Sequence, residues 1–353
     1  MEHHSPASAW RGAVTAAPCI RRNSNRMGDM AELGNWAFPS ALQPSPKEVA
    51  FDLAATLDAV VKVSAEVPED AFTAETLGVE RSGNGVVIRD DGLVLTIGYL
   101  ITEAQTIWLT TNHGIAVPGH PLAYDQASGF GLVLPLGNLG VAPLPRGTTA
   151  TVSVGDSVIL SGHGGRAHSL KAKVIAKREF AGYWEYLLDE ALFTAPAHPQ
   201  WGGAALIGEE GELLGVGSLL VQESSKGETV EGNMVVPIDL LEPIFEDMLT
   251  LGRAGGPPRP WLGLYATEVE GHLVVGGLAK GGPAERAGVQ IGDIVQEIAD
   301  VRVARLPDMF RSVWSLGPAG TDVPVTLSRD GASVRVRLRS VDRNDLLRKP
   351  KLH

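Results

Sequence analysis

The sequence predicts a mainly β protein with two folded domains. Its 353 residues are too many for one ordinary domain and enough for two domains that each bury a core. The 42 glycines and 23 prolines suit short strands joined by tight turns better than long helices. Strand-like segments bounded by Gly, Pro or Asp recur from residue 85 to residue 238, and such spacing is typical of a barrel or a sandwich.

Changes in composition divide the chain into five parts. Residues 1–45 mix Ser, Pro, Arg and His without periodicity and are expected to form a flexible leader. The glycines and prolines of residues 252–260 predict a linker, because glycine breaks regular structure and proline stiffens a spacer. The linker separates a first domain, residues 46–251, from a second, residues 261–341, and residues 342–353 are expected to be a solvated basic tail.

Two helices are expected within the first domain. The apolar pattern of residues 49–64 indicates a short helix that runs into a strand. A second helix is predicted from Leu240 to Leu251, with Asp239 as its N-terminal cap and Gly252 at its end.

Charge and cysteine content limit the classes of partner. A formal charge of −11 argues against nucleic acid, because phosphate binding needs a basic surface. The single cysteine, Cys19, excludes an internal disulfide. No segment has the apolar length of a secretory signal or a membrane span, so a cytoplasmic location is expected, whether translation starts at Met1, Met27 or Met30.

The second domain carries the most specific motif, GGPAERAGVQIGDI, at Gly281–Ile294. Pro283 suits a first helical turn, Gly288 a left-handed helix end, and Gly292 a tight turn before a strand. A helix at Pro307–Ser315 and a hairpin turn at residues 329–331 are expected after it. The motif and this order of elements resemble the PDZ domains of the HtrA/Deg serine proteases.

The resemblance to that family implies a peptide-binding loop at the start of the domain. In the family, backbone N–H groups of an aromatic-apolar-Gly-apolar loop hold a peptide's C-terminal carboxylate, and Trp261, Leu262, Gly263 and Leu264 match this form. The alternative is that Trp261 only packs the linker against the first domain.

The first domain resembles the trypsin-like double β-barrel of the same family. Residues 82–88 and 91–96 reproduce the strand pair that precedes the family's catalytic histidine. Gly202 and Gly203, followed by residues 204–207 and 211–216, reproduce the strand pair after its nucleophile, and residues 235–238 match the last barrel strand.

The resemblance places the three triad positions at Tyr99, Gly129 and Trp201. Proteolysis by this architecture needs a hydroxyl nucleophile, an imidazole base and a carboxylate that orients the imidazole. A phenol with a pKa near 10 is a poor base at neutral pH, glycine has no side chain to orient a base, and indole has no nucleophilic oxygen. The sequence therefore predicts a degenerate triad and no catalytic residue.

Other residues of catalytic type are assigned structural roles. His113 falls where a hairpin turn is expected. Asp125 lies four positions before the expected position of the triad carboxylate, Gly129, and is expected to cap a loop. His163 and His168 are placed beside the inactive cleft, without the spacing of a metal site. The candidate nucleophiles Ser161, Ser169 and Ser218 are interpreted as surface or turn hydroxyls away from the paired glycines.

The leading functional hypothesis is a pseudoprotease that acts as a peptide-binding adaptor through its PDZ groove, without a cofactor or metal. Its expected partners are protein C-termini or extended peptides, and the resemblance implies a homotrimer or co-assembly with an active paralogue. A serine endopeptidase with an unorthodox catalytic constellation, serving protein quality control, is the alternative.

Overall fold

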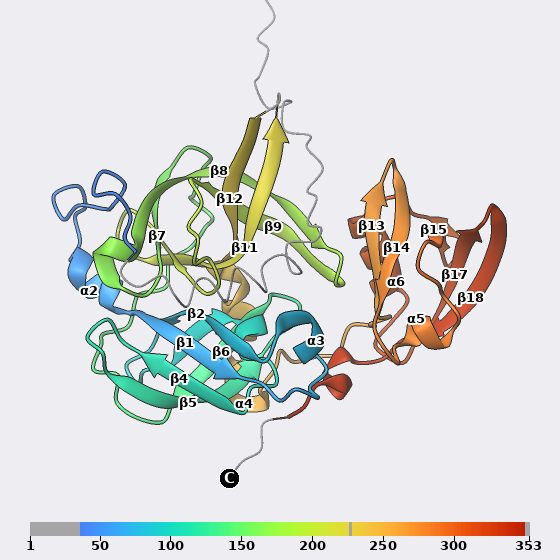
Figure 1. Ribbon diagram of the computed structural model, residues 1–353, viewed down its shortest axis with the longest axis horizontal. Helices are drawn as coiled ribbons and strands as arrows, with labels where there is room; N and C mark the ends of the chain where they lie inside the picture. Colours follow the sequence, from blue (N-terminus) through green and yellow to red (C-terminus); the bar gives the residue numbers. More distant parts are fainter. Residues whose placement is uncertain (1–35, 226–227, 350–353) are drawn as a thin grey trace, which may run out of the picture. The chain divides into compact units, whose positions relative to one another are not determined.

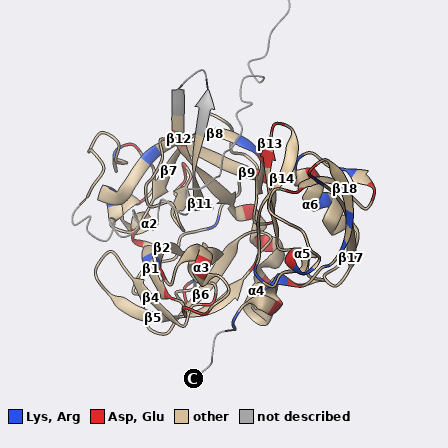
Figure 2. Cartoon of the chain, turned by 45° about the vertical axis from the view of Figure 1, so that its right-hand side comes forward, with Lys and Arg blue, Asp and Glu red and all other residues tan. Residues whose placement is uncertain are grey.

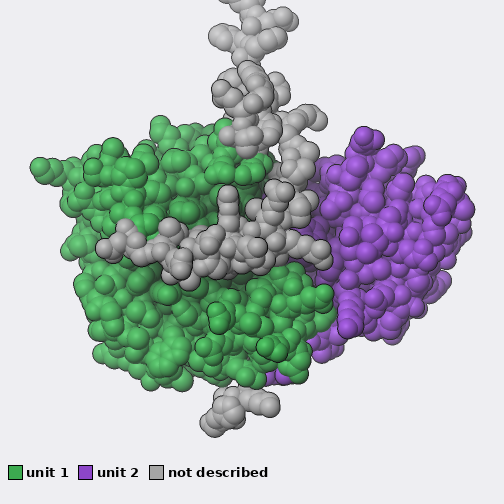
Figure 3. Space-filling model, in the orientation of Figure 1, with its two compact units in different colours: residues 1–178, 190–254, 350–353 green, residues 179–189, 255–349 purple. Residues whose placement is uncertain are grey.

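The computed structural model describes residues 36–225 and 228–349. The described chain forms two compact units, coloured separately in Figure 3. Unit 1 contains residues 36–178 and 190–254, and unit 2 contains residues 179–189 and 255–349. The sequence predicts residues 179–189 within the first domain; in the structure these residues, which include the ends of two barrel strands, group with unit 2.

Unit 1 contains two closed antiparallel barrels (Figure 1), which confirms the predicted mainly β class. The first barrel has the strand order β1-β2-β3-β6-β5-β4. Its strands are β1 (Val60–Glu66), β2 (Glu80–Val87), β3 (Val94–Ile97), β4 (Thr106–Thr110), β5 (Ala116–Tyr124) and β6 (Phe130–Pro135). The interior is aliphatic, with Val63, Leu95 and Leu132 fully buried. Burial of such side chains contributes about 25 cal/mol for each Å² of apolar area removed from water.

The second barrel has the order β10-β11-β12-β9-β8-β7. Its strands are β7 (Ser157–Ser161), β8 (Ser169–Gly182), β9 (Tyr186–Ala195), β10 (Ala205–Ile207), β11 (Leu213–Ser225) and β12 (Glu228–Pro237). Leu160, Leu206 and Val235 lie in its core. The strand pair β10–β11 directly follows the paired glycines, as the sequence predicts.

Short helices connect and close the barrels. They are α2 (Leu53–Asp58), α3 (Ala74–Leu77), α4 (Phe245–Leu251) and the 3₁₀ turns η1 (Gly98–Leu100), η2 (Gly165–His168), η3 (Ile238–Leu240) and η4 (Glu242–Ile244). The Asp52 carboxylate caps α2 by accepting from the backbone N–H groups of Ala54 and Ala55. None of the helices in the described part of the chain is long and apolar enough to cross a membrane.

The predicted helix Leu240–Leu251 is correct only in its second half. The α-helical part begins at Phe245 and ends at Gly252, which has φ +72° as a left-handed helix end requires. Asp239 does not cap it. Its carboxylate instead accepts from Thr149 N at 2.8 Å and from the hydroxyls of Thr148 and Thr149, so a long-range contact replaced the local cap.

Unit 2 contains one antiparallel sheet with two short helices. The strands are β13 (Leu264–Val269), β14 (His272–Leu278), β15 (Ile294–Ile298), β16 (Val301–Arg302), β17 (Asp322–Arg329) and β18 (Ala332–Arg339). The sheet order is β13-β14-β15-β17-β18, and β16 pairs with β15. The helices are α5 (Pro283–Arg286) and α6 (Leu306–Ser315), followed by the 3₁₀ turn η5 (Arg343–Leu346). Arginines at alternate positions make β18 the basic edge of the sheet (Figure 2).

The turn chemistry of the Gly281–Ile294 motif is realised as predicted. Pro283 begins α5, and Gly288 and Gly292 have φ of +80° and +95°. The buried Asp293 carboxylate accepts from Gln290 N at 2.8 Å and pairs with the Arg329 guanidinium at 2.7 Å. This pairing holds the pKa of Asp293 below its usual value, first through the Arg329 hydrogen bond.

The ends of the described chain are more ordered than the sequence predicts. Residues 36–45, assigned to the flexible leader, contact the second barrel through Phe38 N to Ala167 O at 2.9 Å and Lys171 N to Leu42 O at 2.8 Å. Trp36 also lies against His168, with 4.5 Å between ring centroids. The basic tail begins with η5 rather than as a solvated segment. Residues 1–35, with Cys19, lie outside the described residues.

Gly203 provides a test of the packing between the barrels. A Cβ atom on Gly203 would lie 1.8 Å from the Asn84 backbone oxygen, whereas a Cβ on Gly114 would meet nothing within 4 Å, and both residues have positive φ. Gly114→Ala should destabilise unit 1 by about 1 to 2 kcal/mol through backbone strain alone. Gly203→Ala should cost at least about 2 kcal/mol more, because the clash with backbone cannot relax. Urea denaturation of the two variants measures the difference, and equal midpoints would contradict it.

Candidate functional site

Tyr99 lies where the two barrels of unit 1 meet. Strand β3 ends at Ile97, and the 3₁₀ turn Gly98–Leu100 presents the Tyr99 side chain. The Tyr99 hydroxyl donates to the Ser218 carbonyl of β11 at 2.9 Å. Burial raises the pKa of Tyr99 above its usual range, and a hydrogen bond from the Trp201 side chain partly opposes this shift. Tyr99 therefore remains a protonated donor at neutral pH and cannot act as a general base.

Trp201 lies opposite Tyr99, on the turn before the paired glycines. Asn84 of β2 fixes this turn, since its side-chain amide donates to Gln200 O at 2.9 Å and to Gly202 O at 3.1 Å. Trp201 is half-buried, and its side chain lies close enough to the Tyr99 hydroxyl to influence the pKa of that group. A Cβ atom on Gly202 would lie 2.8 Å from the same hydroxyl oxygen. Tyr99 and the turn that carries Trp201 are therefore neighbours.

Gly129 joins this cluster through its backbone. Its carbonyl accepts from Gly98 N at 2.7 Å, directly before Tyr99, and its φ of +83° allows the turn before β6. The structure therefore brings the positions of Tyr99, Gly129 and Trp201 together. Asp125 lies in the same loop and caps it, because its carboxylate accepts from the N–H and hydroxyl of Ser128, both at 2.7 Å.

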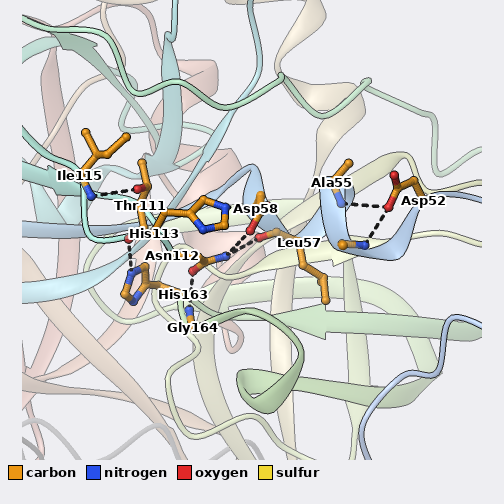
Figure 4. A network of polar contacts seen from close by, with 11 residues as sticks. Asp52, Ala55, Leu57, Asp58, Thr111, Asn112, His113, Ile115, His163 and Gly164 are labelled. Atoms are coloured by element: carbon orange, nitrogen blue, oxygen red, sulfur yellow. Dashed lines mark hydrogen bonds and ion pairs between the residues drawn. The ribbon is translucent and has the colours of Figure 1, made fainter.

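His113 lies in the β4–β5 hairpin turn, as the sequence predicts. Its Nε2 contacts the Asp58 carboxylate at 2.9 Å, and its side chain is 64% exposed. Figure 4 shows this pair beside Asn112, which donates to Leu57 O at 3.0 Å and accepts from Gly164 N at 2.7 Å. The network fastens the hairpin turn to neighbouring segments.

The three serines differ from their predicted surface or turn roles, because all are buried. Ser161 and Ser169 lie on paired strands, and their hydroxyls hydrogen-bond to each other at 2.9 Å. Ser218 lies on β11 and accepts from Tyr99 through its carbonyl. Alternation along a strand placed these side chains inward, a register that turn signals did not reveal.

A histidine group lies behind the Trp201 turn. The fully buried His198 was missed by sequence reasoning. Its Nδ1 accepts from Gln200 N at 3.0 Å, and its Nε2 contacts His168 O at 2.9 Å. His163 contacts Thr111 O at 3.2 Å. Across residues 36–225 and 228–349 no cluster of three or more His, Cys, Asp or Glu side chains is arranged to hold a metal ion.

The predicted peptide-binding loop opens the sheet of unit 2. Trp261 is buried, and its backbone pairs with that of Val341. The carbonyls of Leu262 and Gly263 accept from Ala284 N and Ala279 N, both at 2.9 Å. The backbone N–H groups of residues 262–264 remain available to one common acceptor. The φ of +67° at Gly263 allows the loop to take this conformation.

A side-chain carboxylate, that of Glu185, lies in front of these N–H groups. Its oxygens accept from Leu262 N at 3.0 Å, Gly263 N at 2.7 Å and Leu264 N at 3.2 Å. Burial raises the pKa of Glu185 to about 7, opposed by these hydrogen bonds and by the charge of Arg343. The loop thus binds a carboxylate in the manner expected, and the carboxylate belongs to the same chain. No sequence signal marks Glu185, because its partners lie about 78 residues away.

Comparison with known proteins identifies both domains. The model of the trypsin-like peptidase domain matches residues 83–216, and the model of the PDZ domain matches residues 260–339. The serine endoprotease DegS of Haemophilus influenzae is 23% identical over 273 residues, covering 74% of this chain and 77% of that protein. The putative serine protease HhoA of a Synechocystis strain is 26% identical over 242 residues, covering 60% of this chain and 59% of the relative.

Solved structures share the fold. The serine endoprotease from Yersinia pestis covers 84% of this chain and 99% of its own, with 22% identity and a TM-score of 0.50. The HtrA-type protease AlgW with a decapeptide covers 85% of this chain and 100% of its own, with 16% identity and a TM-score of 0.50. The fold and the two domains define a trypsin-like peptidase domain followed by a PDZ domain. This order of domains is shared with the HtrA/Deg proteases among the relatives, which the chain resembles over most of its length.

His198 should make stability depend on pH. Burial lowers the pKa of His198 from 6.5 to about 4. In addition, Nδ1 of the ring accepts from Gln200 N, so a proton on Nδ1 would face that N–H group. The folded protein binds this proton less tightly than the unfolded chain, so stability is present above pH 6.5 and is lost as pH falls toward 4. Between pH 7 and pH 5 the loss should be on the order of 2 kcal/mol. Urea midpoints at these two pH values measure it.

The matched comparison uses two substitutions. His198→Gln should flatten the pH slope, whereas His113→Gln, at an exposed turn, should keep it. A slope that survives His198→Gln would show that other groups cause it.

Proposed function

We propose that this protein is a pseudoprotease of the HtrA/Deg family that acts as a peptide-binding adaptor through its PDZ groove. The observation that carries the proposal is the Tyr99 phenol, which donates to the Ser218 carbonyl at 2.9 Å beside the turn that carries Trp201, at the positions that the family resemblance gives to the base and the nucleophile. A glycine backbone occupies the position of the orienting carboxylate.

Acyl transfer needs a hydroxyl or thiol beside a base that can accept its proton. The Tyr99 phenol has a raised pKa and already donates its proton to Ser218 O, so it cannot take another. The Trp201 indole, at the position that the resemblance gives to the nucleophile, offers only an N–H donor. These features support loss of proteolysis with retention of the barrel fold.

Serine endopeptidase activity is the second candidate, favoured by the names of the relatives. It would need a serine outside the family position, and two of the buried serines, Ser161 and Ser169, are hydrogen-bonded to each other. Adaptor function is therefore the better supported proposal, and PDZ membership supports peptide partners.

Proteolysis is tested with casein. The wild-type chain should release no fragments above a buffer blank and should not react with a serine-directed phosphonate. The triple substitution Tyr99→His, Gly129→Asp and Trp201→Ser returns the triad chemistry to one cleft and should produce phosphonate labelling at position 201. Wild-type casein turnover that survives Tyr99→Ala with Trp201→Ala and is blocked by the phosphonate would instead establish the endopeptidase.

Peptide capture is tested by fluorescence anisotropy with a library of C-terminal decapeptides. Binding should require the free terminal carboxylate and weaken at least tenfold when the same peptides are amidated, because the loop offers backbone donors to an anion. Equal binding of free and amidated peptides would refute carboxylate capture.

A further inference from the structure

The hairpin tip, residues 179–189, joins β8 to β9 and belongs to unit 2 together with the PDZ domain. Glu185 lies at its turn with φ +61°, a conformation that costs a residue other than glycine about 1 to 2 kcal/mol. The side chain is nevertheless buried, with 8% of its surface exposed. A strained backbone and a buried carboxylate at a hairpin turn require a compensating interaction.

The compensation is the contact with the peptide-binding loop. Backbone N–H groups of three consecutive residues, Leu262, Gly263 and Leu264, converge on the Glu185 carboxylate within 2.7–3.2 Å. Such charge-assisted hydrogen bonds are stronger than neutral ones. They are also the contacts that a peptide's terminal carboxylate would make, so the two carboxylates compete for the same donors.

A second residue of the hairpin tip lies in the apolar part of unit 2. Leu187 is buried with 7% exposure, in the same hydrophobic cluster as Leu262, Leu264 and Phe310. Leu262 and Leu264 belong to the loop that binds Glu185, and Phe310 belongs to α6. The hairpin tip therefore supplies a carboxylate to the loop and, two residues later, an aliphatic side chain to the hydrophobic core of unit 2.

Ion pairs fasten the base of the hairpin tip to α6. The Glu179 carboxylate contacts Arg305 at 3.0 Å and Arg311 at 2.6 Å, and Arg311 also pairs with Asp189. Tyr183 contacts Tyr265 of β13 edge to face, with 6.1 Å between centroids. The exposed ion pairs add little energy by themselves. Together these contacts place the hairpin tip against both β13 and α6.

We propose that the hairpin tip is an internal ligand of the PDZ groove, in which Glu185 stands for a peptide's terminal carboxylate and Leu187 for its apolar last side chain. This inference rests on the proposed peptide-binding function and names the ligand class: chain ends that present a free carboxylate beside an aliphatic side chain. Such a chain end binds only when it displaces Glu185.

Because a peptide must displace Glu185, the apparent affinity of the groove for that peptide is lowered. An intramolecular ligand is always present at high effective concentration, and the measured Kd rises by the inverse of the fraction of molecules whose groove is open. Removal of the internal carboxylate should therefore tighten peptide binding, whereas removal of a structural residue would weaken it.

The test measures binding of a fluorescein-labelled decapeptide ending in Ala-Ala-Leu to the full chain. Glu185→Gln keeps the side-chain length and removes the charge, and it should bind at least tenfold tighter than wild type. Glu185→Gly, which also relieves the positive φ, should bind tighter still. The control is Glu190→Gln, which removes an exposed carboxylate of β9 paired with Lys177 and should bind like wild type.

The specificity part of the proposal uses the same variants. Glu185→Gln should prefer the peptide ending in Leu over one ending in Lys, and should not bind the amidated peptide. Equal affinity of wild type and both Glu185 variants for the Leu peptide would overturn the internal-ligand proposal and leave the proposed peptide binding intact.

Amide hydrogen exchange tests the internal ligand without any peptide. The N–H groups of Gly263 and Leu264 should exchange at least tenfold faster in Glu185→Gly than in wild type and in Glu190→Gln. Unchanged exchange would overturn the proposal. If no variant binds any peptide, the proposed peptide binding fails, and the exchange rates alone decide whether Glu185 occupies the loop.

Discussion

Asn84 is the residue on which the geometry of the cleft depends. It is almost fully buried, and it donates from its backbone and side chain to the Gln200–Gly202 turn of the second barrel. Its own carbonyl accepts from the Thr96 hydroxyl at 2.6 Å, and its side-chain oxygen accepts from His163 N at 2.8 Å. One amide side chain thus connects strands of both barrels. The close approach of Gly203 to its carbonyl follows from the same contact, so the paired glycines have a packing role that does not require catalysis.

In both candidate sites, groups of the chain itself occupy the functional positions. Between the barrels, the Tyr99 hydroxyl donates to the Ser218 carbonyl beside the turn that carries Trp201. In the PDZ loop, the amides that would hold a terminal carboxylate hold Glu185. The two cases differ in reversibility. Aromatic side chains built into the cleft change only by mutation, whereas a hairpin carboxylate can exchange with a ligand of the same chemistry.

Local chemistry explains what could be predicted. The Gly281–Ile294 motif fixes its turns through glycines at positive φ and a proline at the first helical position, and these requirements act within a few residues. The Tyr99, Gly129 and Trp201 positions could be located because the strands around them keep their order. The prediction that Asp239 caps the helix was wrong, because two threonines some 90 residues away in the chain bind that carboxylate instead. The prediction that the three serines are surface or turn residues was wrong, because strand register, not turn propensity, sets which face a side chain occupies.

The sequence by itself determined the mainly β class, the order of the barrel and PDZ domains, and the turns of the Gly281–Ile294 motif. These follow from composition, periodicity and turn residues, which act locally. Only the tertiary structure decided that the Tyr99 hydroxyl binds the Ser218 carbonyl, that residues 36–45 pack on the second barrel, and that the Glu185 carboxylate binds the loop of residues 262–264. Each of these contacts joins segments far apart in the chain. Closing such loops is governed by the packing of the whole fold, which no local pattern encodes.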